Sequence, residues 1–339
     1  MNYTIYDIAK AANVSKSTVS RVLNNQDNIS GEARERVLNA IKQLNYQPSK
    51  LARGLSSGFD AILVISRSTK TTTHNPFFSE VMHTISTSAE EENFDVIVQT
   101  SNNSEDELQK CITKIKEKMV KGILMLSSPT NEDFYKQLDA YNIPIVVIGK
   151  VVDKYKNVYS IDTNNYEDSY NLTKLLVEQG HREIACIHSP LNYHVSTDRL
   201  EGYINCLKDY HLPIRSEWIL DGGYTVESAQ EAVESFYKLT HRPTGVLATD
   251  DLKVMSLYKE ANKEGISIPE NLSIVGYSNN YFSLFLSPSP TSIEIPVMEL
   301  GSAGAQLLFS KIKGENKVNI ETIIPTKINI GGSVAPVSH

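Results

Sequence analysis

The chain has 339 residues, of which 40% are hydrophobic and 22% are charged. This length exceeds what one small core needs, so the sequence predicts two or three globular domains. No apolar run reaches the ~18 residues of a membrane span, and polar residues follow Met1 directly. We therefore expect no membrane span and no export signal, and a cytoplasmic location.

Charge is distributed unevenly along the chain. Residues 1–58 contain eight Lys or Arg and four Asp or Glu, a balance of +4, whereas the whole chain carries −7. The remaining residues therefore carry −11. A basic head on an acidic body is typical of a nucleic-acid-binding module joined to a different domain.

Residues 3–25 have the pattern of two short helices joined by a tight turn. Ile5, Ile8 and Ala12 give the first helix an apolar face at spacings of three and four residues. Ser15 stands at the N-cap position of the second helix, where its hydroxyl accepts a backbone N–H bond. The pattern predicts a helix–turn–helix.

The second helix carries a polar face opposite its apolar stripe. A helix fits the major groove of DNA, where long basic and short polar side chains reach base edges or phosphates. A solvated face on an ordinary helical hairpin is the alternative interpretation. The members of this face are Lys16, Ser17, Thr18, Ser20, Arg21 and Asn24.

A third helix is predicted over 31–45, with Ser30 as its cap. We expect Val37, Leu38, Ile41 and Leu44 to form the face that closes the small core. Pro48 prevents this helix from continuing. A further short helix through Leu51 and Leu55 is too short to be stable alone, so we expect it to become ordered on DNA or on a partner chain.

From residue 60 onward, apolar runs alternate with helical patterns, which predicts an α/β fold with parallel sheets flanked by helices. Two successive sets of this alternation predict two lobes. The predicted strands cover 61–66, 94–100, 122–126, 144–148, 157–161, 184–187, 218–220, 245–248 and 273–277. The predicted helices cover 77–91, 105–119, 132–141, 164–179, 199–210, 226–239, 251–264 and 297–312.

Ligand sites in such sheets form at the carboxyl ends of the strands. Aromatic rings and hydrogen-bonding side chains at these ends suit a sugar, whose C–H faces stack on rings while its hydroxyls pair with polar groups. The predicted effector-binding residues are Phe77, Phe78, Lys150, Asp162, Asn164, Arg199, Tyr224, Thr249, Asp250, Ser278 and Asn279. The phenylalanines have an alternative role in the core, and Asp250 one as a helix cap.

No catalytic constellation accompanies these features. The sequence lacks the P-loop, H-E-x-x-H and G-x-G-x-x-G motifs. The three cysteines, Cys111, Cys186 and Cys206, lack C-x-x-C spacing and predict free thiols. We therefore expect no enzyme activity, no metal site and no cofactor apart from a small-molecule effector.

The head motif T-V-S-R-V-L-N followed by Y-Q-P-S-K-L-A-R-G-L resembles the LacI/GalR family of bacterial transcription regulators. The resemblance implies a periplasmic-binding-protein-like body, with the effector in the cleft. It also implies that Lys16, Ser17 and Arg21 read bases, that Leu55 wedges into the minor groove, and that Arg199 binds effector. Further residues expected to contact DNA are Thr4, Tyr6, Ser15, Lys50, Leu51 and Ala52.

Several positions depart from the usual family pattern. Lys150 and Ser278 each stand where the family usually has Asp, and Thr249 stands where it usually has Asn. The I-G-K and V-G-Y-S-N-N segments look like the maltose-operon repressors of Gram-positive bacteria. This resemblance favours maltose or a maltodextrin as effector.

The predicted function is a sequence-specific repressor whose affinity for a pseudo-palindromic operator in double-stranded DNA is controlled by a small sugar. Because the C-terminal tail has no leucine heptads, we expect a homodimer. The open alternatives are another sugar or a nucleoside as effector, a co-repressor mode, and a non-regulatory sugar-binding protein. The predicted domains are a head at 1–47, a hinge at 48–59 and a body at 60–339, with lobes at 60–160 plus 290–320 and at 161–289 plus 321–332.

Overall fold

The computed structural model describes residues 3–23, 28–46, 59–67, 76–278, 280–315 and 321–337. The chain divides into two compact units, Met1–Asp60 and Ala61–His339, which are described separately below. Six residues with predicted site roles lie outside the described residues, namely Asn24, Lys50, Leu51, Ala52, Leu55 and Asn279.

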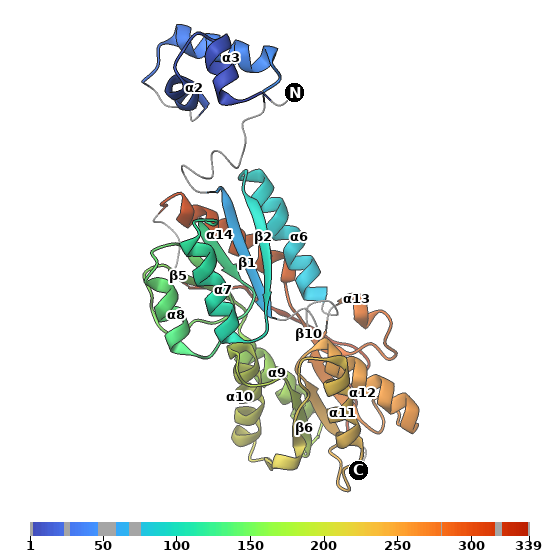
Figure 1. Ribbon diagram of the computed structural model, residues 1–339. Coiled ribbons are helices and arrows are strands. Elements are labelled where there is room, and N and C mark those ends of the chain that lie inside the picture. Colours follow the sequence, from blue (N-terminus) through green and yellow to red (C-terminus); the bar gives the residue numbers. More distant parts are fainter. Residues whose placement is uncertain are drawn as a thin grey trace. The chain divides into compact units, whose positions relative to one another are not determined.

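The described residues of the head unit form three helices, α1 (Ile5–Ala11), α2 (Lys16–Leu23) and α3 (Gly31–Gln43) (Figure 1). Its core is built on Ile8, Val19 and Val37, one residue from each helix and each fully buried. The turn between α1 and α2 is tight because Asn13 adopts a φ of 48°, a left-handed conformation that Asn tolerates well. The predicted helix–turn–helix is therefore present.

Helix α3 differs from its prediction in two respects. It ends at Gln43, and Asn45 beyond it has a φ of 45°, which no regular helix allows. Leu38 was expected in the core but is 53% exposed, so that prediction is wrong. Ala40 is buried there instead, because the small head buries only a narrow stripe of α3 and Leu38 lies about 100° around the helix from Val37.

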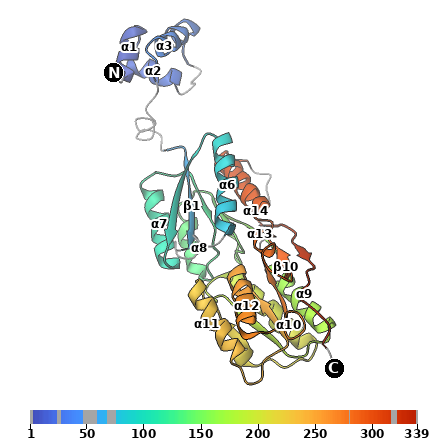
Figure 2. The same cartoon turned by 90° about the vertical axis from the view of Figure 1, so that its right-hand side faces the viewer.

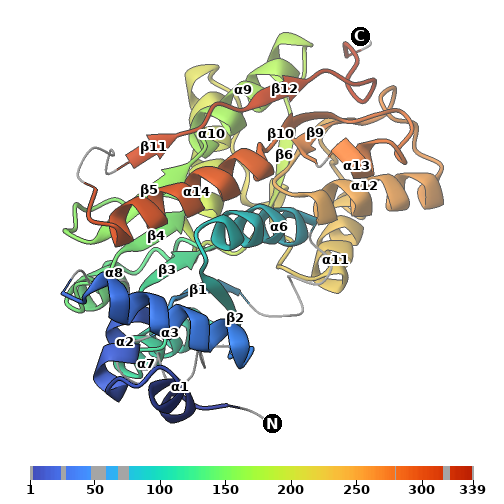
Figure 3. The same cartoon turned by 90° about the horizontal axis from the view of Figure 1, so that it is seen from above.

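The first lobe of the body is built on a six-stranded sheet in the order β11-β5-β4-β3-β1-β2, parallel throughout. Helices α6 (Pro76–Glu91) and α14 (Val297–Ile312) pack together on one face, while α7 (Ser104–Lys116) and α8 (Glu132–Asp139) cover the other (Figure 3). The strands are β11 (Glu321–Ile323), β5 (Val158–Asp162), β4 (Ile145–Ile148), β3 (Gly122–Met125), β1 (Ala61–Arg67) and β2 (Asp95–Ser101).

The second lobe repeats this plan with the order β12-β10-β9-β8-β6-β7, in which only the β10–β12 pair is antiparallel. One face carries α9 (Asn165–Glu178) and α10 (His194–Asp209), and the other carries α11 (Val226–Tyr237) and α12 (Asp251–Glu264) (Figure 2). The strands are β12 (Lys327–Asn329), β10 (Thr291–Glu294), β9 (Ser273–Tyr277), β8 (Gly245–Ala248), β6 (Ile184–His188) and β7 (Ile219–Asp221). The turn η1 (Ser216–Trp218) and the short helix α13 (Asn280–Ser283) complete the lobe.

The chain passes between the lobes after β5, after β10 and after β11. The predicted lobe boundaries are wrong for two strands, because β10 belongs to the second sheet and β11 to the first. The strands β10, β11 and β12 were not predicted, because each contains only one apolar residue and so lacks the apolar run that marks a buried strand. Along the described ranges, no helix combines the length and apolar content that crossing a membrane requires.

The buried strands explain why the sheets form here. Residues Ala61–Ile65 of β1 and all of β3, β4, β8 and β9 are buried, as expected for parallel strands covered on both faces. Polar side chains start the adjoining helices, for example Asn103 at α7 and Thr225 at α11. The structure confirms the predicted combination of an all-α head with a two-lobed α/β body.

Candidate functional site

A cavity of about 220 Å³ lies in the body, and residues of both lobes line it. It is placed at the carboxyl ends of β5, β6, β8 and β9, as the rule for parallel sheets requires. Seven of the predicted effector-binding residues line this cavity, namely Phe77, Asp162, Arg199, Tyr224, Thr249, Asp250 and Ser278.

Arg199 is a cation of the cavity wall that three contacts hold in place. Its guanidinium carbon lies 3.5 Å from the ring centroid of Tyr277. Nε donates to Asn165 Oδ1 at 2.8 Å, and Nη1 donates to the Thr249 carbonyl at 2.5 Å. These contacts fix the plane of the guanidinium, which leaves further N–H groups to bind a ligand.

Asp162 extends this arrangement into the first lobe. Its Oδ1 accepts from the Thr163 backbone N–H at 2.8 Å and from Asn165 Nδ2 at 3.1 Å. Burial raises the pKa of the Asp162 carboxyl to about 7, although the Thr163 N–H and the charge of Arg199 act in the opposite direction. Asp162 therefore presents a carboxyl that both accepts and, when protonated, donates hydrogen bonds.

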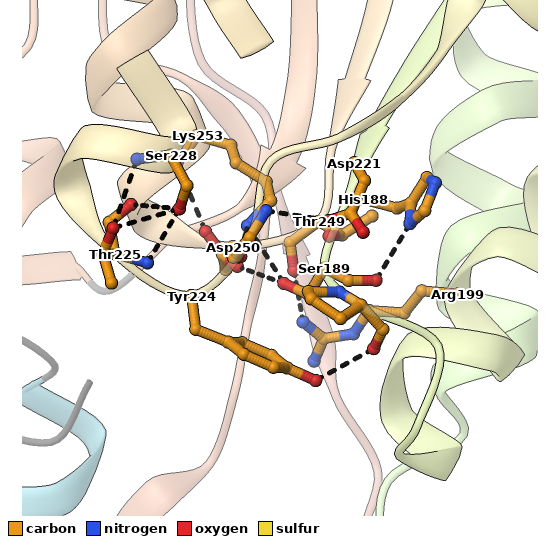
Figure 4. A network of polar contacts seen from close by, with 12 residues as sticks. His188, Ser189, Arg199, Asp221, Tyr224, Thr225, Ser228, Thr249, Asp250 and Lys253 are labelled. Carbon is orange, nitrogen blue, oxygen red and sulfur yellow. Dashed lines mark hydrogen bonds and ion pairs between the residues drawn. The ribbon is translucent and has the colours of Figure 1, made fainter. Parts of the chain in front are cut away.

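Asp250 is held by a buried lysine (Figure 4). Lys253 Nζ lies 2.6 Å from Asp250 Oδ2, 3.0 Å from Ser189 Oγ and 3.0 Å from the Gly223 carbonyl. The Lys253 side chain is fully buried, and Gly222 makes room for it, since a Cβ there would lie 2.7 Å from Lys253 Cε. Asp250 also caps α12 through the Lys253 N–H, so its alternative role as a cap is also present.

Three predicted effector-binding residues do not line the cavity. Phe78 packs against the hydrophobic core of the first lobe. Lys150 forms an ion pair across the lobes with Asp198 on α10, at 3.0 Å. Asn164 caps α9 by accepting from the Glu167 N–H at 3.2 Å. The predicted position is wrong by one residue, because Asn165, the first residue of α9, lines the cavity instead of Asn164.

The two lobes also meet through their backbones beside the cavity. The His194 N–H donates to the Ser128 carbonyl at 2.9 Å, and the Thr130 N–H donates to the Asn192 carbonyl at 3.2 Å. Pro129 and Tyr193 form an antiparallel bridge between these bonds. The lobes are thus in direct backbone contact beside the cavity.

The polar face of α2 is the second candidate site. Lys16, Ser17 and Arg21 are exposed, whereas Thr18 and Ser20 are half-buried. Ser15 accepts from the Thr18 N–H at 3.1 Å, so its hydroxyl caps α2 as predicted.

Two further residues predicted to contact DNA have partners within the head. Lys16 Nζ lies 3.1 Å from the hydroxyl of the exposed Tyr6 and 4.7 Å from its ring centroid. Thr4 forms a capping box with Asp7 at the start of α1.

Several residues of the cavity were not predicted. Arg67 is the last residue of β1, one position beyond the predicted strand, so the rule about strand ends would have found it. Tyr277 is the last residue of β9, so the same rule would have identified it. Ser196 lines the cavity from within α10, and Lys253, which does not line the cavity but holds Asp250, lies within α12; no local pattern marks either residue. Within the described ranges, no group of three His, Cys, Asp or Glu side chains is placed to hold a metal.

Two family models match the chain. Residues 4–49 match the bacterial regulatory proteins of the lacI family. Residues 60–331 match the periplasmic binding proteins and sugar binding domain of the LacI family. The chain belongs to the LacI family. It is therefore a DNA-binding transcriptional regulator with a ligand-binding domain.

Known relatives extend over nearly the whole chain. The HTH-type transcriptional repressor PurR of Klebsiella pneumoniae (strain 342) is 30% identical over 321 residues, covering 94% of this chain and 93% of PurR. The transcriptional regulator CelR in complex with cellobiose is 25% identical, with a TM-score of 0.73, and the match covers 98% of this chain and 100% of CelR. The lac repressor dimer bound to operator and the anti-inducer ONPF shares the fold at 22% identity, with a TM-score of 0.82 and coverage of 99% and 100%.

These matches correct one expectation. We predicted a particular resemblance to the maltose-operon repressors of Gram-positive bacteria. The curated relatives instead include PurR repressors from several bacteria. The family assignment is confirmed, and the narrower resemblance is not.

Proposed function

We propose that this protein is a transcriptional repressor that binds operator DNA through α2, with an operator affinity controlled by a small sugar in the body cavity. Relatives that are 29–30% identical over more than nine-tenths of the chain are named repressors. Maltose is the first sugar to test, and CelR, the relative in complex with cellobiose, supports a sugar as the class of effector.

The observation that carries this proposal is the placement of Arg199. Its guanidinium is fixed on Tyr277 between the Asn165 amide and the Thr249 carbonyl, and it faces a cavity that also holds Asp162 and Phe77. A rigid fork of donors beside a carboxyl acceptor suits neighbouring hydroxyls, and a ring of Phe suits the C–H face of a sugar.

The size of the cavity limits the effector. Its volume of about 220 Å³ lies below the range of about 300–1,000 Å³ typical of drug-sized ligands. A small sugar is therefore favoured over a long maltodextrin.

On the DNA side, we propose that Lys16, Ser17 and Arg21 of α2 read base edges, because all three are exposed on one short helix. Ser20 and Thr18 are suited to phosphate contacts. A homodimer would place two such helices about 34–36 Å apart on a pseudo-palindromic operator.

The effector and the operator are coupled in this proposal. A coupling free energy of about 1–3 kcal/mol suffices for useful regulation, and it acts equally in both directions. Operator affinity measured by fluorescence anisotropy with and without sugar gives its sign, since an inducer weakens operator binding and a co-repressor strengthens it.

The test is a thermal-shift screen of the full-length protein with glucose, ribose, maltose, cellobiose, nucleosides and nucleobases, followed by calorimetry. A specific ligand raises the melting temperature by mass action. Arg199→Met is expected to abolish the shift. Arg182→Met is the control, because Arg182 also bonds a carbonyl, that of Val177, but does not line the cavity.

The outcomes separate the alternatives. A shift with a sugar that Arg199→Met removes and Arg182→Met retains supports the proposal. A shift with a nucleobase or nucleoside alone replaces the sugar with that class. Equal sugar affinity with and without saturating operator contradicts effector control of DNA binding.

A further inference from the structure

An ion pair joins the two lobes beside the cavity. Lys150 follows β4 in the first lobe, and Asp198 lies on α10 in the second lobe. The Lys150 ammonium lies 3.0 Å from each of the two Asp198 carboxylate oxygens. The pair is therefore a direct electrostatic contact between the lobes, and any separation of the lobes at this point breaks it.

The Asp198 carboxylate depends on Lys150 for its charge compensation. The Asp198 side chain is only 10% exposed, and among the described residues it has no other hydrogen-bond or ion-pair partner. The guanidinium of the next residue, Arg199, donates to Asn165 and Thr249 instead. A carboxylate with so little access to water is costly without a cation, so loss of Lys150 favours any arrangement that hydrates Asp198.

The backbone of Lys150 is fixed next to a second contact between the lobes. The Ser128 hydroxyl donates to the Lys150 carbonyl. Gly149 allows this close approach, because a Cβ there would lie 2.6 Å from Ser128 Cβ, and its φ of 136° suits only glycine. The Ser128 carbonyl in turn accepts from the His194 N–H of the second lobe at 2.9 Å. The ion pair and the backbone contact thus share Ser128, so they should form and break together.

The shape of the cavity depends on this contact. Phe77 of the first lobe and Arg199 and Asp250 of the second lobe line the same cavity, so its walls face each other only while the lobes stay together. A ligand that contacts both walls binds only this closed arrangement, and its apparent affinity rises with the fraction of protein that is already closed.

We propose that Lys150 and Asp198 form an electrostatic latch that favours the closed arrangement of the two lobes and thereby preorganises the cavity. Neither residue lines the cavity, so both act by positioning the lobes and not by contacting a ligand. The inference is independent of which ligand the cavity binds, and its test requires none.

The experiment is hydrogen–deuterium exchange with mass spectrometry on the full-length protein without added ligand. Peptides that contain Thr130 and His194 report on the latch, because both backbone N–H groups bond to carbonyls of the other lobe. Strand β8, which is buried inside the second lobe, reports on global unfolding.

The variants are Lys150→Met, Lys150→Asp, and Lys150→Asp combined with Asp198→Lys. Lys174→Met is the matched control. The Lys150 and Lys174 side chains are both 42% exposed, but Lys174 pairs with Glu178 inside α9 and joins no lobes.

Lys150→Met is expected to accelerate exchange at Thr130 and His194 by about fivefold, the upper end of what a partly exposed ion pair contributes. Lys150→Asp is expected to accelerate it further, because two carboxylates then repel each other. The combined variant restores opposite charges and is expected to return exchange towards the wild-type rate. Exchange in β8 should not change in any variant, and Lys174→Met should leave all three sites unchanged.

Each other outcome contradicts the latch. Unchanged exchange at Thr130 and His194 in Lys150→Met shows that the pair does not hold the lobes. Equal acceleration in β8 shows a general loss of stability instead of lobe opening. If the combined variant exchanges as fast as Lys150→Asp, charge attraction is not the cause. Should Lys150→Met fail to fold, Asp198→Asn, which keeps the shape without the charge, is judged by the same criteria.

Discussion

The DNA-binding face of the head and the cavity of the body use polar side chains in opposite ways. Lys16, Ser17 and Arg21 on α2 are exposed, and the core of the head is made of other residues. In the body, Lys253 is fully buried and Arg199 is bonded to Asn165 and Thr249. In the head, different side chains form the core and the candidate DNA-binding face. In the body, the same polar side chains stabilise the fold and line or support the cavity.

This difference predicts how substitutions act. In the head, removal of a recognition side chain leaves no buried partner behind, so stability stays constant while DNA binding falls. In the body, removal of one member of a network leaves the others buried without partners, which costs stability as well as binding. Three measurements, ordered by expected effect, sharpen or break this comparison.

The largest effect is expected from Lys253→Met. This change leaves Asp250 and Ser189 without their ammonium partner, and Asp250 is only 30% exposed. Loss of one partner of a buried ion pair predicts a decrease of about 3 kcal/mol in the free energy of unfolding, measured by urea titration.

Lys259→Met is the matched control, because Lys259 is exposed on the same helix. Its effect should stay within about 0.5 kcal/mol. Adding Asp250→Asn to Lys253→Met should restore part of the lost stability, because it removes the unpaired charge. A Lys253→Met protein as stable as the wild type would contradict the structural role of the network.

The second effect is a pH dependence that originates in the body. Glu107 on α7 is fully buried and accepts a hydrogen bond from Ser127. Burial raises its pKa from 4.5 to about 7. The folded protein therefore binds more protons than the unfolded chain between these values, and stability decreases as the pH rises through this window.

Urea titrations at pH 5 and pH 8 test this effect with Glu107→Gln, which keeps the shape without the charge. The variant is expected to gain on the order of 2 kcal/mol relative to the wild type between these two pH values. Glu105→Gln, at an exposed position of the same helix, should show no such gain. A wild-type stability that does not fall between pH 5 and pH 8 relative to Glu107→Gln would show that burial does not shift Glu107.

The smallest effect, about 1.5 kcal/mol or roughly tenfold in affinity, is expected for operator binding by Arg21→Ala. The free energy of unfolding should change by less than about 0.5 kcal/mol, since Arg21 is exposed. Fluorescence anisotropy with an operator obtained by in vitro selection measures the affinity.

Lys42→Ala removes the same charge from α3 and serves as the control. Lys42→Ala should weaken operator binding less than Arg21→Ala does, and it should lower the affinity for every DNA sequence by the same factor. If the two variants lose the same affinity, Arg21 contributes only charge and reads no base.

The sequence predicted the head well because its signals are local. The apolar positions of α1 and α2, the cap at Ser15 and the turn at Asn13 all lie within a few residues of one another. The cavity was predicted only in part. The positions of the strand ends correctly indicated Asp162, Thr249, Asp250 and Ser278. Lys150 and Asn164 also follow strands, but Lys150 forms an ion pair with Asp198 and Asn164 caps a helix.

The sequence alone determined the class of this protein. Three features indicated it: the periodicity of α1 and α2, the basic charge of residues 1–58, and the alternation of apolar runs with helical patterns. Each depends on residues that are close together in the sequence, so it can be recognised without the tertiary structure. The tertiary structure decided which polar groups meet. Arg67 with Tyr193 and Tyr224, Lys150 with Asp198, and Lys253 with Ser189 are pairs of residues 48 or more positions apart, which only the folded lobes bring within contact distance.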